Sequence, residues 1–460
     1  MQLYNTLTRK KEDFKPIKEG SVGLYTCGPT VYGYPHLGNM RTYIFEDLLK
    51  RVLTYNNYEV NHVMNITDVG HLTGDRDMGV DKVERESAKT GQTAWEIADF
   101  YTTAFKEDLK SLNIIFPNTF CKATDNIPEQ IAMIQTLEEK GFTYKITDGI
   151  YFDTAKVADY NKLSHQKIED LREGARVEIN AEKKNPTDFA LWKLSPTGAK
   201  RQMEWESPWG VGFPGWHIEC SAMSVKYLGE QFDIHCGGVD HIDIHHTNEL
   251  AQTESATSKK PWVNYWLHSA FLNGIGGKKM AKSSGDFITV TNTFTEKGIS
   301  PLVYRFANLS VHYRKPMEWS EEALISAKNG YENLLVKISK LGQKTGKLSL
   351  EYKDKFLADI NDDLNMSKAL ATVQELLKSD LSDEDKLATV LDFDKVLGLN
   401  LRLETKADIE IPEAVIEILK KRETARQNKD WKSSDELRDE ILKLGYQVTD
   451  ADAGQEIKLI

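Results

Sequence analysis

The sequence predicts an α/β protein built on a doubly wound parallel sheet. Residues 22–27 form a short β-type run closed by Gly28-Pro29, and residues 41–55 carry apolar side chains at helical spacing. Residues 58–66 then predict a second strand. A strand, a loop, a helix and a strand in this order are typical of a nucleotide-binding unit. We therefore expect a sheet of the Rossmann type.

The pattern changes along the chain and predicts five segments. Isolated hairpin-like pieces such as residues 149–153 interrupt the sheet pattern, and helical periodicity dominates beyond about Tyr304. Pro412 suits the first turn of a helix and marks a final unit. Helices are expected over residues 321–341, 352–364, 366–378 and 383–396. We expect the first half of the sheet domain at 1–116, an insertion at 117–196, the second half at 197–303, a helical stem at 304–400 and a small C-terminal domain at 401–460.

The composition is ordinary for a soluble globular protein, with 40% hydrophobic and 28% charged residues among 460. No apolar run approaches the roughly 20 residues that span a bilayer, and the N-terminal residues lack the pattern of a secretory signal. The net charge of −11 counts against wholesale coating of nucleic acid, although a local basic track can still bind phosphate. Four cysteines are too few to cross-link this chain, so we expect reduced thiols and a cytoplasmic protein without a membrane partner.

The first candidate site is the loop from Gly28 to Asn39. It follows the first strand, and His36 lies just before the first helix. Helix N-termini offer free backbone N–H groups and a positive dipole, which suit phosphate. Glycine at position 38 would let a nucleotide approach the backbone closely. A turn that merely contains a histidine remains the alternative.

The second candidate is the segment 276–285, which places Lys279 and Lys282 among glycines and serines. A cationic loop of this kind can close over a polyphosphate and neutralise charge on a leaving pyrophosphate. A solvated basic loop is the usual explanation for such a stretch taken alone.

A third set contains metal-ligating residue types: Cys27, Cys220 and the run from His245 to Glu249. On a helix, His245 and Glu249 would share one face. Two thiolates, an imidazole and a carboxylate are an acceptable zinc set. The spacing is not that of a zinc finger, so a buried cysteine pair is the commoner explanation at this point. Cys236, His241 and His246 lie nearby in the sequence.

Two further segments suggest nucleotide and RNA contacts. An apolar run ends in glycines before Asp240, and an acid at such a turn can hold ribose hydroxyls. Residues 420–432 are rich in lysine and arginine and include Trp431. Basic groups beside an aromatic ring suit a single-stranded RNA loop. A solvent-exposed, charged helix face is the more common explanation for a basic segment such as 420–432.

Together these segments resemble class I aminoacyl-tRNA synthetases. His-Leu-Gly-Asn at 36–39 is similar to the HIGH signature, and Lys-Met-Ala-Lys-Ser at 279–283 is similar to the KMSKS signature. The stretches 25–32, 65–68, 185–193 and 215–223 narrow the resemblance to cysteinyl-tRNA synthetases, over nearly the whole chain.

The resemblance implies ATP-dependent activation of L-cysteine to cysteinyl-adenylate, followed by transfer to the 3′ end of cysteine tRNA. It implies one zinc ion per subunit that selects the substrate thiolate, magnesium with ATP, a monomer and a C-terminal anticodon-binding domain. The implied residues are His36, Asn39, Lys279 and Lys282 for catalysis; His36, Asn39, Gly238, Asp240 and Lys282 for ATP; Thr67, Trp216 and His235 for cysteine; Cys27, Cys220, His245 and Glu249 for the metal; and Arg426, Trp431, Asp435 and Asp450 for the anticodon.

The chain departs from the family pattern in places. Ala281 replaces the serine within KMSKS, and Cys236 stands where many relatives have glycine, so a second thiol could lie near the metal. The C-terminal tail lacks the tryptophan that many relatives carry. Two other functions stay open. A ligase joining cysteine to an amino-sugar acceptor would not need the C-terminal unit, and a non-catalytic tRNA-binding paralogue is disfavoured by the presence of His36, Lys279 and Lys282.

Overall fold

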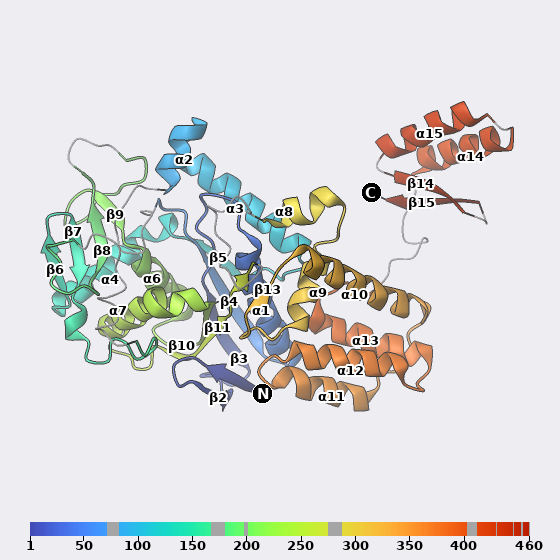
Figure 1. The fold of residues 1–460 in the computed structure, drawn as a ribbon. Coiled ribbons are helices and arrows are strands. Elements are labelled where there is room, and N and C mark those ends of the chain that lie inside the picture. The colour runs from blue at the N-terminus through green and yellow to red at the C-terminus, as the bar shows by residue number, and fades with distance from the viewer. Residues whose placement is uncertain are drawn as a thin grey trace. The chain divides into compact units, whose positions relative to one another are not determined.

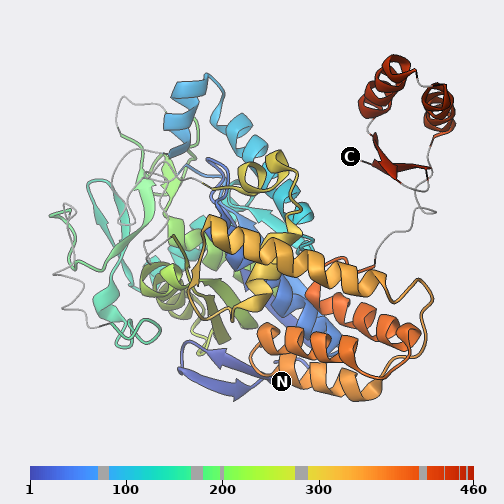
Figure 2. The same cartoon turned by 45° about the vertical axis from the view of Figure 1, so that its right-hand side comes forward.

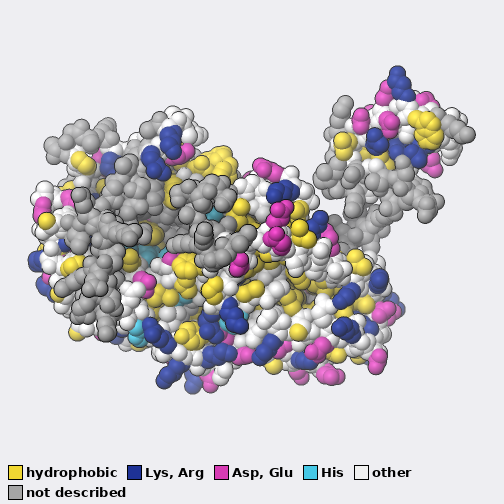
Figure 3. Space-filling model, viewed as in Figure 1, with side chains coloured by type: hydrophobic (Ala, Val, Ile, Leu, Met, Phe, Trp, Pro, Cys, Tyr) yellow, Lys and Arg dark blue, Asp and Glu magenta, His cyan; other side chains and the backbone are white. Residues whose placement is uncertain are grey.

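The computed structural model describes residues 1–70, 82–166, 180–196, 201–274, 288–402, 412–428, 430–444, 446–451 and 454–459. The chain forms two compact units, Met1–Leu401 and Arg402–Ile460 (Figures 1 and 2). Within the described segments, every helix is too short or too polar to cross a membrane. On the face of the first unit seen in Figure 3, acidic and basic side chains are interspersed.

The first unit is built on a five-stranded parallel sheet with the order β11-β10-β3-β4-β5. Side chains from both of its faces are buried: Met64 of β4 packs in the same apolar cluster as helix α1, whereas Val63 packs in a second cluster with helix α6. Helices therefore cover both faces, and the predicted α/β class is confirmed. The elements are β3 (Ser21–Thr26), α1 (Leu37–Tyr55), β4 (Glu59–Ile66), β5 (Thr119–Lys122), α6 (Trp216–Leu228), β10 (Phe232–Gly238), α7 (Thr247–Thr257) and β11 (Val263–Ser269).

A second, antiparallel sheet interrupts the first and differs from the expected insertion at both ends. Its order is β6-β7-β8-β9, with β6 at Thr143–Ile146, β7 at Gly149–Phe152, β8 at Phe189–Leu194 and β9 at Gly212–Pro214. The central sheet continues beyond residue 116, because β5 pairs with β4, and the second sheet continues beyond residue 196. Both β5 and β9 have at most four residues, which is too short for a clear periodic signal.

Helices make up most of the remaining described chain. Beyond Tyr304, four helices begin within two residues of the positions that the sequence predicts. The C-terminal unit packs two helices on a two-stranded sheet around Val415, Ile418 and Ile441. The elements are β1 (Gln2–Asn5), β2 (Lys10–Asp13), α2 (Lys82–Thr90), α3 (Ala94–Ser111), α4 (Ile127–Glu139), β12 (Leu272–Asn273), α8 (Val290–Thr293), α9 (Leu302–Ser310), β13 (Met317–Glu318), α10 (Glu321–Ser339), α11 (Leu350–Asn361), α12 (Met366–Lys378), α13 (Asp383–Leu397), α14 (Glu413–Gln427), α15 (Trp431–Lys443), β14 (Tyr446–Ala451) and β15 (Gly454–Leu459).

A buried carboxylate on α1 ties the sheet domain to the helices that follow it. One oxygen of Asp47 accepts bonds from Arg51 at 2.8 Å and from the fully buried Arg305 of α9 at 2.6 Å. Its other oxygen accepts the backbone N–H of Ile115 at 2.8 Å. Arg305 also donates to the carbonyl oxygen of Leu397 at 2.6 Å, at the end of α13. This network holds α1 in place against α9 and the end of α13.

Replacing this carboxylate, as in Asp47→Ala, should lower the free energy of unfolding of the first unit by about 3–5 kcal/mol, because Arg305 would stay buried without its counter-charge. Urea unfolding followed by circular dichroism measures the loss. Glu375→Ala removes an exposed partner of Lys355 and is the matched control, since exposed pairs contribute little. Equal losses in the two variants would contradict this role for Asp47.

Candidate functional site

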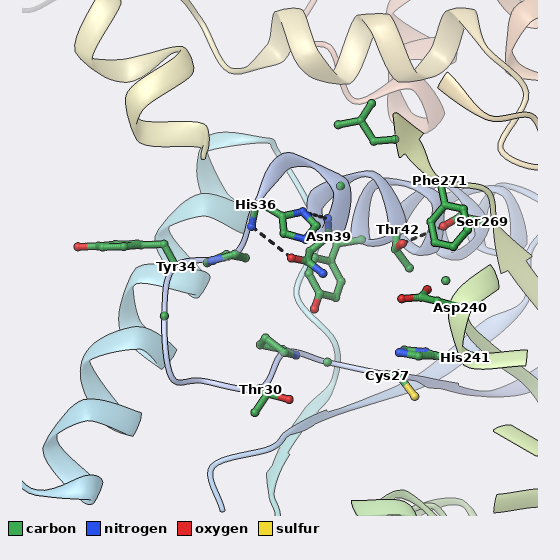
Figure 4. Close-up of a pocket in the computed structure, with 18 of the residues that line it drawn as sticks. Cys27, Thr30, Tyr34, His36, Asn39, Thr42, Asp240, His241, Ser269 and Phe271 are labelled. Carbon is green, nitrogen blue, oxygen red and sulfur yellow. Dashed lines mark hydrogen bonds between the residues drawn. The ribbon is translucent and has the colours of Figure 1, made fainter. Parts of the chain in front are cut away.

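A cavity of about 300 Å³ opens where β3 and β10 end side by side. These strands pair in parallel, with Thr26 opposite Cys236, so the segments that follow them emerge at the same edge of the sheet. The cavity is lined by the loop after β3, the start of α1, the turn after β10, the first residue of α6 and the segment from Ser269 to Leu272 (Figure 4). The lining residues that the sequence predicts for the site are Cys27, His36, Asn39, Trp216, Gly238 and Asp240.

The loop after β3 ends in a capping box at the start of α1. His36 has an extended backbone and precedes the first helical residue; its Nδ1 accepts the backbone N–H of Asn39 at 3.2 Å. The Asn39 side-chain oxygen accepts the backbone N–H of His36 at 3.2 Å (Figure 4). Because Nδ1 accepts a hydrogen bond, the neutral ring carries its proton on Nε2. A Cβ at Gly38 would lie 2.8 Å from this ring, so only glycine fits there.

Across the cavity, the turn after β10 presents a carboxylate. A Cβ at Gly238 would lie 2.4 Å from a carboxylate oxygen of Asp240, so the missing side chain makes room for that group. The hydroxyls of Thr42 and Ser269 lie 2.8 Å apart at the same end (Figure 4). A carboxylate and hydroxyls facing a helix N-terminus suit the sugar and phosphates of a nucleotide.

Four buried donors form a candidate metal centre beside this cavity. The ligand atoms of Cys27, Cys220, His245 and Glu249 all lie within 4.8 Å of one another. His245 Nε2 is 2.8 Å from Glu249 Oε1, on one face of the helical segment that leads into α7. The structure therefore brings together four residues that the sequence singles out: one directly after β3, one on α6, one in the turn Ile242–His246 and one on α7.

The charges of these groups fit a divalent cation. Although burial favours the neutral acid, the neighbouring His245 and His235 lower the pKa of Glu249 to about 2. Burial also opposes charge on His245, but Glu249 and Cys220 raise its pKa to about 10. The adjacent Cys27 lowers the pKa of Cys220, while burial raises the pKa of Cys27 itself. Metal ligands bind in their deprotonated forms, so a cation held by all four groups would take the place of the protons that they still carry.

A second donor set overlaps the first. Cys27, His235, His246 and Glu249 also place their ligand atoms within 4.8 Å of one another, and His246 Nε2 is 3.3 Å from the Cys27 sulfur. His246 is fully buried. His246 is outside the set expected from the sequence, because the family resemblance implies His245 and not its neighbour as the ligand.

Further histidines hold these donors in place. His217 Nδ1 lies 2.9 Å from His245 Nδ1. His268 Nε2 lies 2.8 Å from His246 Nδ1, and its own Nδ1 lies 2.8 Å from the Thr6 hydroxyl. Bonds of this kind at the second ring nitrogen set the orientation of a metal-ligating histidine. His217 lies within the family-like stretch 215–223, whereas His268 and Thr6 belong to no motif and come from segments far apart in the chain.

Comparison with known proteins identifies the family. Residues 13–329 match the family model described as tRNA synthetases class I (C) catalytic domain, and residues 408–457 match the Cysteinyl-tRNA ligase anticodon binding domain. The Cysteine–tRNA ligase 1 of Burkholderia lata is 48% identical to the chain and covers 99% of it, or 96% of the relative. The Cysteine–tRNA ligase of Treponema denticola is 44% identical and covers 98% of each chain. The chain belongs to the cysteine–tRNA ligase family.

Solved structures agree on the fold of this family member. A methionyl-tRNA synthetase of Mycobacterium tuberculosis, in complex with methionyl-adenylate, superposes with a TM-score of 0.55 at 16% identity over 82% of this chain and 90% of its own. The LeuRS of Agrobacterium radiobacter, from its ternary complex with tRNA and LeuAMS, gives 0.57 at 11% identity over 84% of each chain. The predicted doubly wound fold of class I synthetases is therefore confirmed.

Of the three residues expected to contact cysteine, one lines the cavity. Trp216 lines the cavity, and its ring centroid is 4.5 Å from that of His245. Thr67 is buried and donates to a carboxylate oxygen of Glu219 at 3.1 Å. His235 is fully buried, with Nε2 at 2.9 Å from Glu249 Oε2. Trp216 thus faces the cavity, whereas Thr67 and His235 lie in the layer behind it.

The two lysines of the expected loop and the extra cysteine do not join this site in the described structure. Lys279 and Lys282 lie outside the described residues. Cys236 packs in the apolar cluster of α1, apart from the cluster that holds Cys27 and Cys220, and within the described chain neither donor set includes it. Successive side chains on β10 point to opposite faces of the sheet, which separates the Cys236 thiol from the neighbouring His235.

In the C-terminal unit, the Arg426 guanidinium carbon lies 5.7 Å from the centroid of the Trp431 ring, which is 57% exposed. Asp435 pairs with Arg438 at 3.3 Å on α15. Asp450 lies in β14. An exposed aromatic ring with a cation at its face suits contact with an unpaired base.

Replacing one donor, as in Cys220→Ser, should lower the bound metal of the dialysed protein well below one ion per chain, because a hydroxyl is a weak ligand for a soft cation. Elemental analysis measures the content. Cys121→Ser is the matched control, since Cys121 is equally buried but lies outside both donor sets. Full metal content in Cys220→Ser, with Cys121→Ser unchanged, would show that Cys220 is not a ligand.

Proposed function

We propose that the protein activates L-cysteine with ATP and transfers the cysteinyl group to the 3′ end of cysteine tRNA. One observation carries this proposal: Cys27 belongs both to the buried donor set and to the lining of the cavity. A metal held there would face the place where a small substrate meets the nucleotide. The family membership supports the same reaction.

The reaction needs two steps. The carboxylate of cysteine attacks the α-phosphate of ATP, which gives cysteinyl-adenylate and releases pyrophosphate. The terminal ribose hydroxyl of the tRNA then takes the acyl group and releases AMP. No side-chain nucleophile is required, because positioning and charge stabilisation supply the catalysis.

The cavity residues divide this work among them. His36 and Asn39, at the helix N-terminus, would bind the phosphates, and Gly238 and Asp240 would bind the ribose. Lys279 and Lys282 would neutralise the leaving pyrophosphate, with magnesium accompanying ATP. This assignment follows from the positions of the first four in the cavity wall and from the signature motif for the two lysines.

Zinc gives the selectivity a physical reason. Serine differs from cysteine by one atom, and pocket shape separates such pairs by only about 10- to 200-fold. A bound zinc ion would supply a soft Lewis acid that prefers a thiolate to a hydroxyl. Cys27, Cys220, His245 and Glu249 would hold it, and Trp216 would close the pocket around the amino acid.

The main alternative is a ligase that joins cysteine to an amino-sugar acceptor. It shares the activation half of the reaction but needs no RNA contacts. The separate C-terminal unit, with Arg426 beside the exposed ring of Trp431, favours the tRNA reaction.

Truncation after Leu401 separates the two functions. Cysteine-dependent exchange of pyrophosphate into ATP should remain, because the cavity and both donor sets lie upstream. Charging of cysteine tRNA should fall by at least an order of magnitude, since the basic residues of 420–432 and the stacking contact of Trp431, worth about 1–3 kcal/mol, would be lost. Both rates are compared with those of the full-length chain.

Charging at the full-length rate by the truncated protein would show that the C-terminal unit does something else and would favour the amino-sugar ligase. Absence of cysteine-dependent exchange in the full-length, metal-loaded protein would reject the proposed activation step itself.

A further inference from the structure

Three aromatic side chains form a partly exposed cluster beside the cavity. The ring centroids of Tyr34 and Phe100 are 6.1 Å apart, those of Tyr34 and Tyr101 are 5.2 Å apart, and those of Phe100 and Tyr101 are 5.1 Å apart. All three pairs meet edge to face, with interplanar angles of 76°, 86° and 82°. We call these three residues the aromatic cluster.

The cluster is continuous with the cavity through Tyr34. This residue lines the cavity, and in Figure 4 its side chain points away from His36 and Asn39, toward the neighbouring helix. That helix is α3, since Phe100 and Tyr101 belong to it. A capping box between Thr93 and Glu96 fixes the start of α3, so the cluster stands on a well-defined element.

The exposure of these rings has no explanation in the packing of α3. The helix buries Ile97, Ala98 and Phe105 on its inner side, whereas Phe100 is 51% exposed and Tyr34 is 40% exposed. Hydrophobic side chains also gather on the surface over α3 in Figure 3. An exposed apolar patch at the rim of a cavity is a common mark of a binding surface.

We propose that the aromatic cluster stacks on unpaired bases at the 3′ end of the tRNA as that end enters the cavity. The inference rests on the proposed function, which requires the terminal ribose to reach the adenylate. The 3′ end of the RNA must then pass the rim of the cavity, where Tyr34 both lines the cavity and contacts Phe100.

The chemistry of the cluster suits this occupant. Every base has a π-face, so an aromatic ring can hold a single strand whatever its sequence. Although Tyr34 and Tyr101 both contact Phe100, its side chain stays 51% exposed and can meet a base. The acidic neighbour Asp99 is paired with Lys122 at 2.6 Å, which offsets its repulsion of a phosphate backbone.

The test combines Phe100→Ala with shortening of the RNA. Dissociation constants are measured for a full-length cysteine tRNA transcript and for a transcript lacking its unpaired 3′ nucleotides. Phe100→Ala should weaken binding of the full-length transcript by about 5- to 150-fold, the equivalent of about 1–3 kcal/mol of base stacking. It should leave binding of the shortened transcript unchanged, because the base that stacks is absent.

Matched variants define the role of the ring. Phe100→Tyr should bind like the wild type, since it keeps the π-face. Ile115→Ala, which truncates an apolar side chain 44% exposed beyond the other end of α3, should also bind like the wild type. Cysteine-dependent pyrophosphate exchange without tRNA should be unchanged in all three variants.

Equal weakening of both transcripts by Phe100→Ala, or weakening of neither, would overturn the stacking proposal. Dissociation of a dimer by Phe100→Ala, seen by size-exclusion chromatography, would also overturn it and assign the cluster to a contact between copies of the chain. Failure of the proposed function appears elsewhere, as absence of cysteine-dependent exchange in the wild type.

Discussion

The parallel pairing of β3 with β10 is the constraint on which the candidate site depends. More than 200 residues separate these strands in the sequence, yet Ile234 lies opposite Leu24 and Cys236 opposite Thr26. Their carboxyl ends therefore share one edge of the sheet, where loops can turn toward each other. This pairing sets Cys27 and the start of α1 across from Asp240, and it brings a buried donor set within reach of a nucleotide-sized cavity. The Asp47–Arg305 pair then fixes α1 against the helices that follow.

Charge complementarity explains why so many polar groups can be buried together beneath this edge. Glu249 is fully buried, and its two oxygens face His245 at 2.8 Å and His235 at 2.9 Å. A buried carboxylate without such partners would be strongly unfavourable. His268 lies within hydrogen-bond distance of both His246 and the Thr6 hydroxyl, and these contacts restrict the orientation of the His246 ring. An ion that enters this centre meets ligands already in position.

Local patterns in the sequence predict individual helices and strands well, and they predict the contacts between distant segments less well. The strand expected at 22–27 lies at Ser21–Thr26. The helix expected at 41–55 begins earlier, at Leu37. Its start was missed because the capping side chain is His36, and histidine is not a usual capping residue. The sequence did not predict β5 and β9, because they are short and are stabilised as strands by pairing with β4 and β8. Cys27, Cys220, His245 and Glu249 could be named only through the family resemblance, because their spacing alone marks no metal site. The relay through His268 to Thr6 could not, since it joins residues 262 positions apart, and the contact of Tyr34 with Phe100 likewise arises only from packing.

The central claim is that the donor set around Cys27 and Glu249 distinguishes a thiol from a hydroxyl. Titration calorimetry of cysteine and of serine, with the metal-loaded protein and with the chelator-treated protein, tests it most directly. Pocket shape alone separates such ligands by about 10- to 200-fold. The metal-loaded protein should prefer cysteine by more than that range, and removal of the metal should bring the ratio of dissociation constants within or below it. The same ratio before and after metal removal would contradict the account.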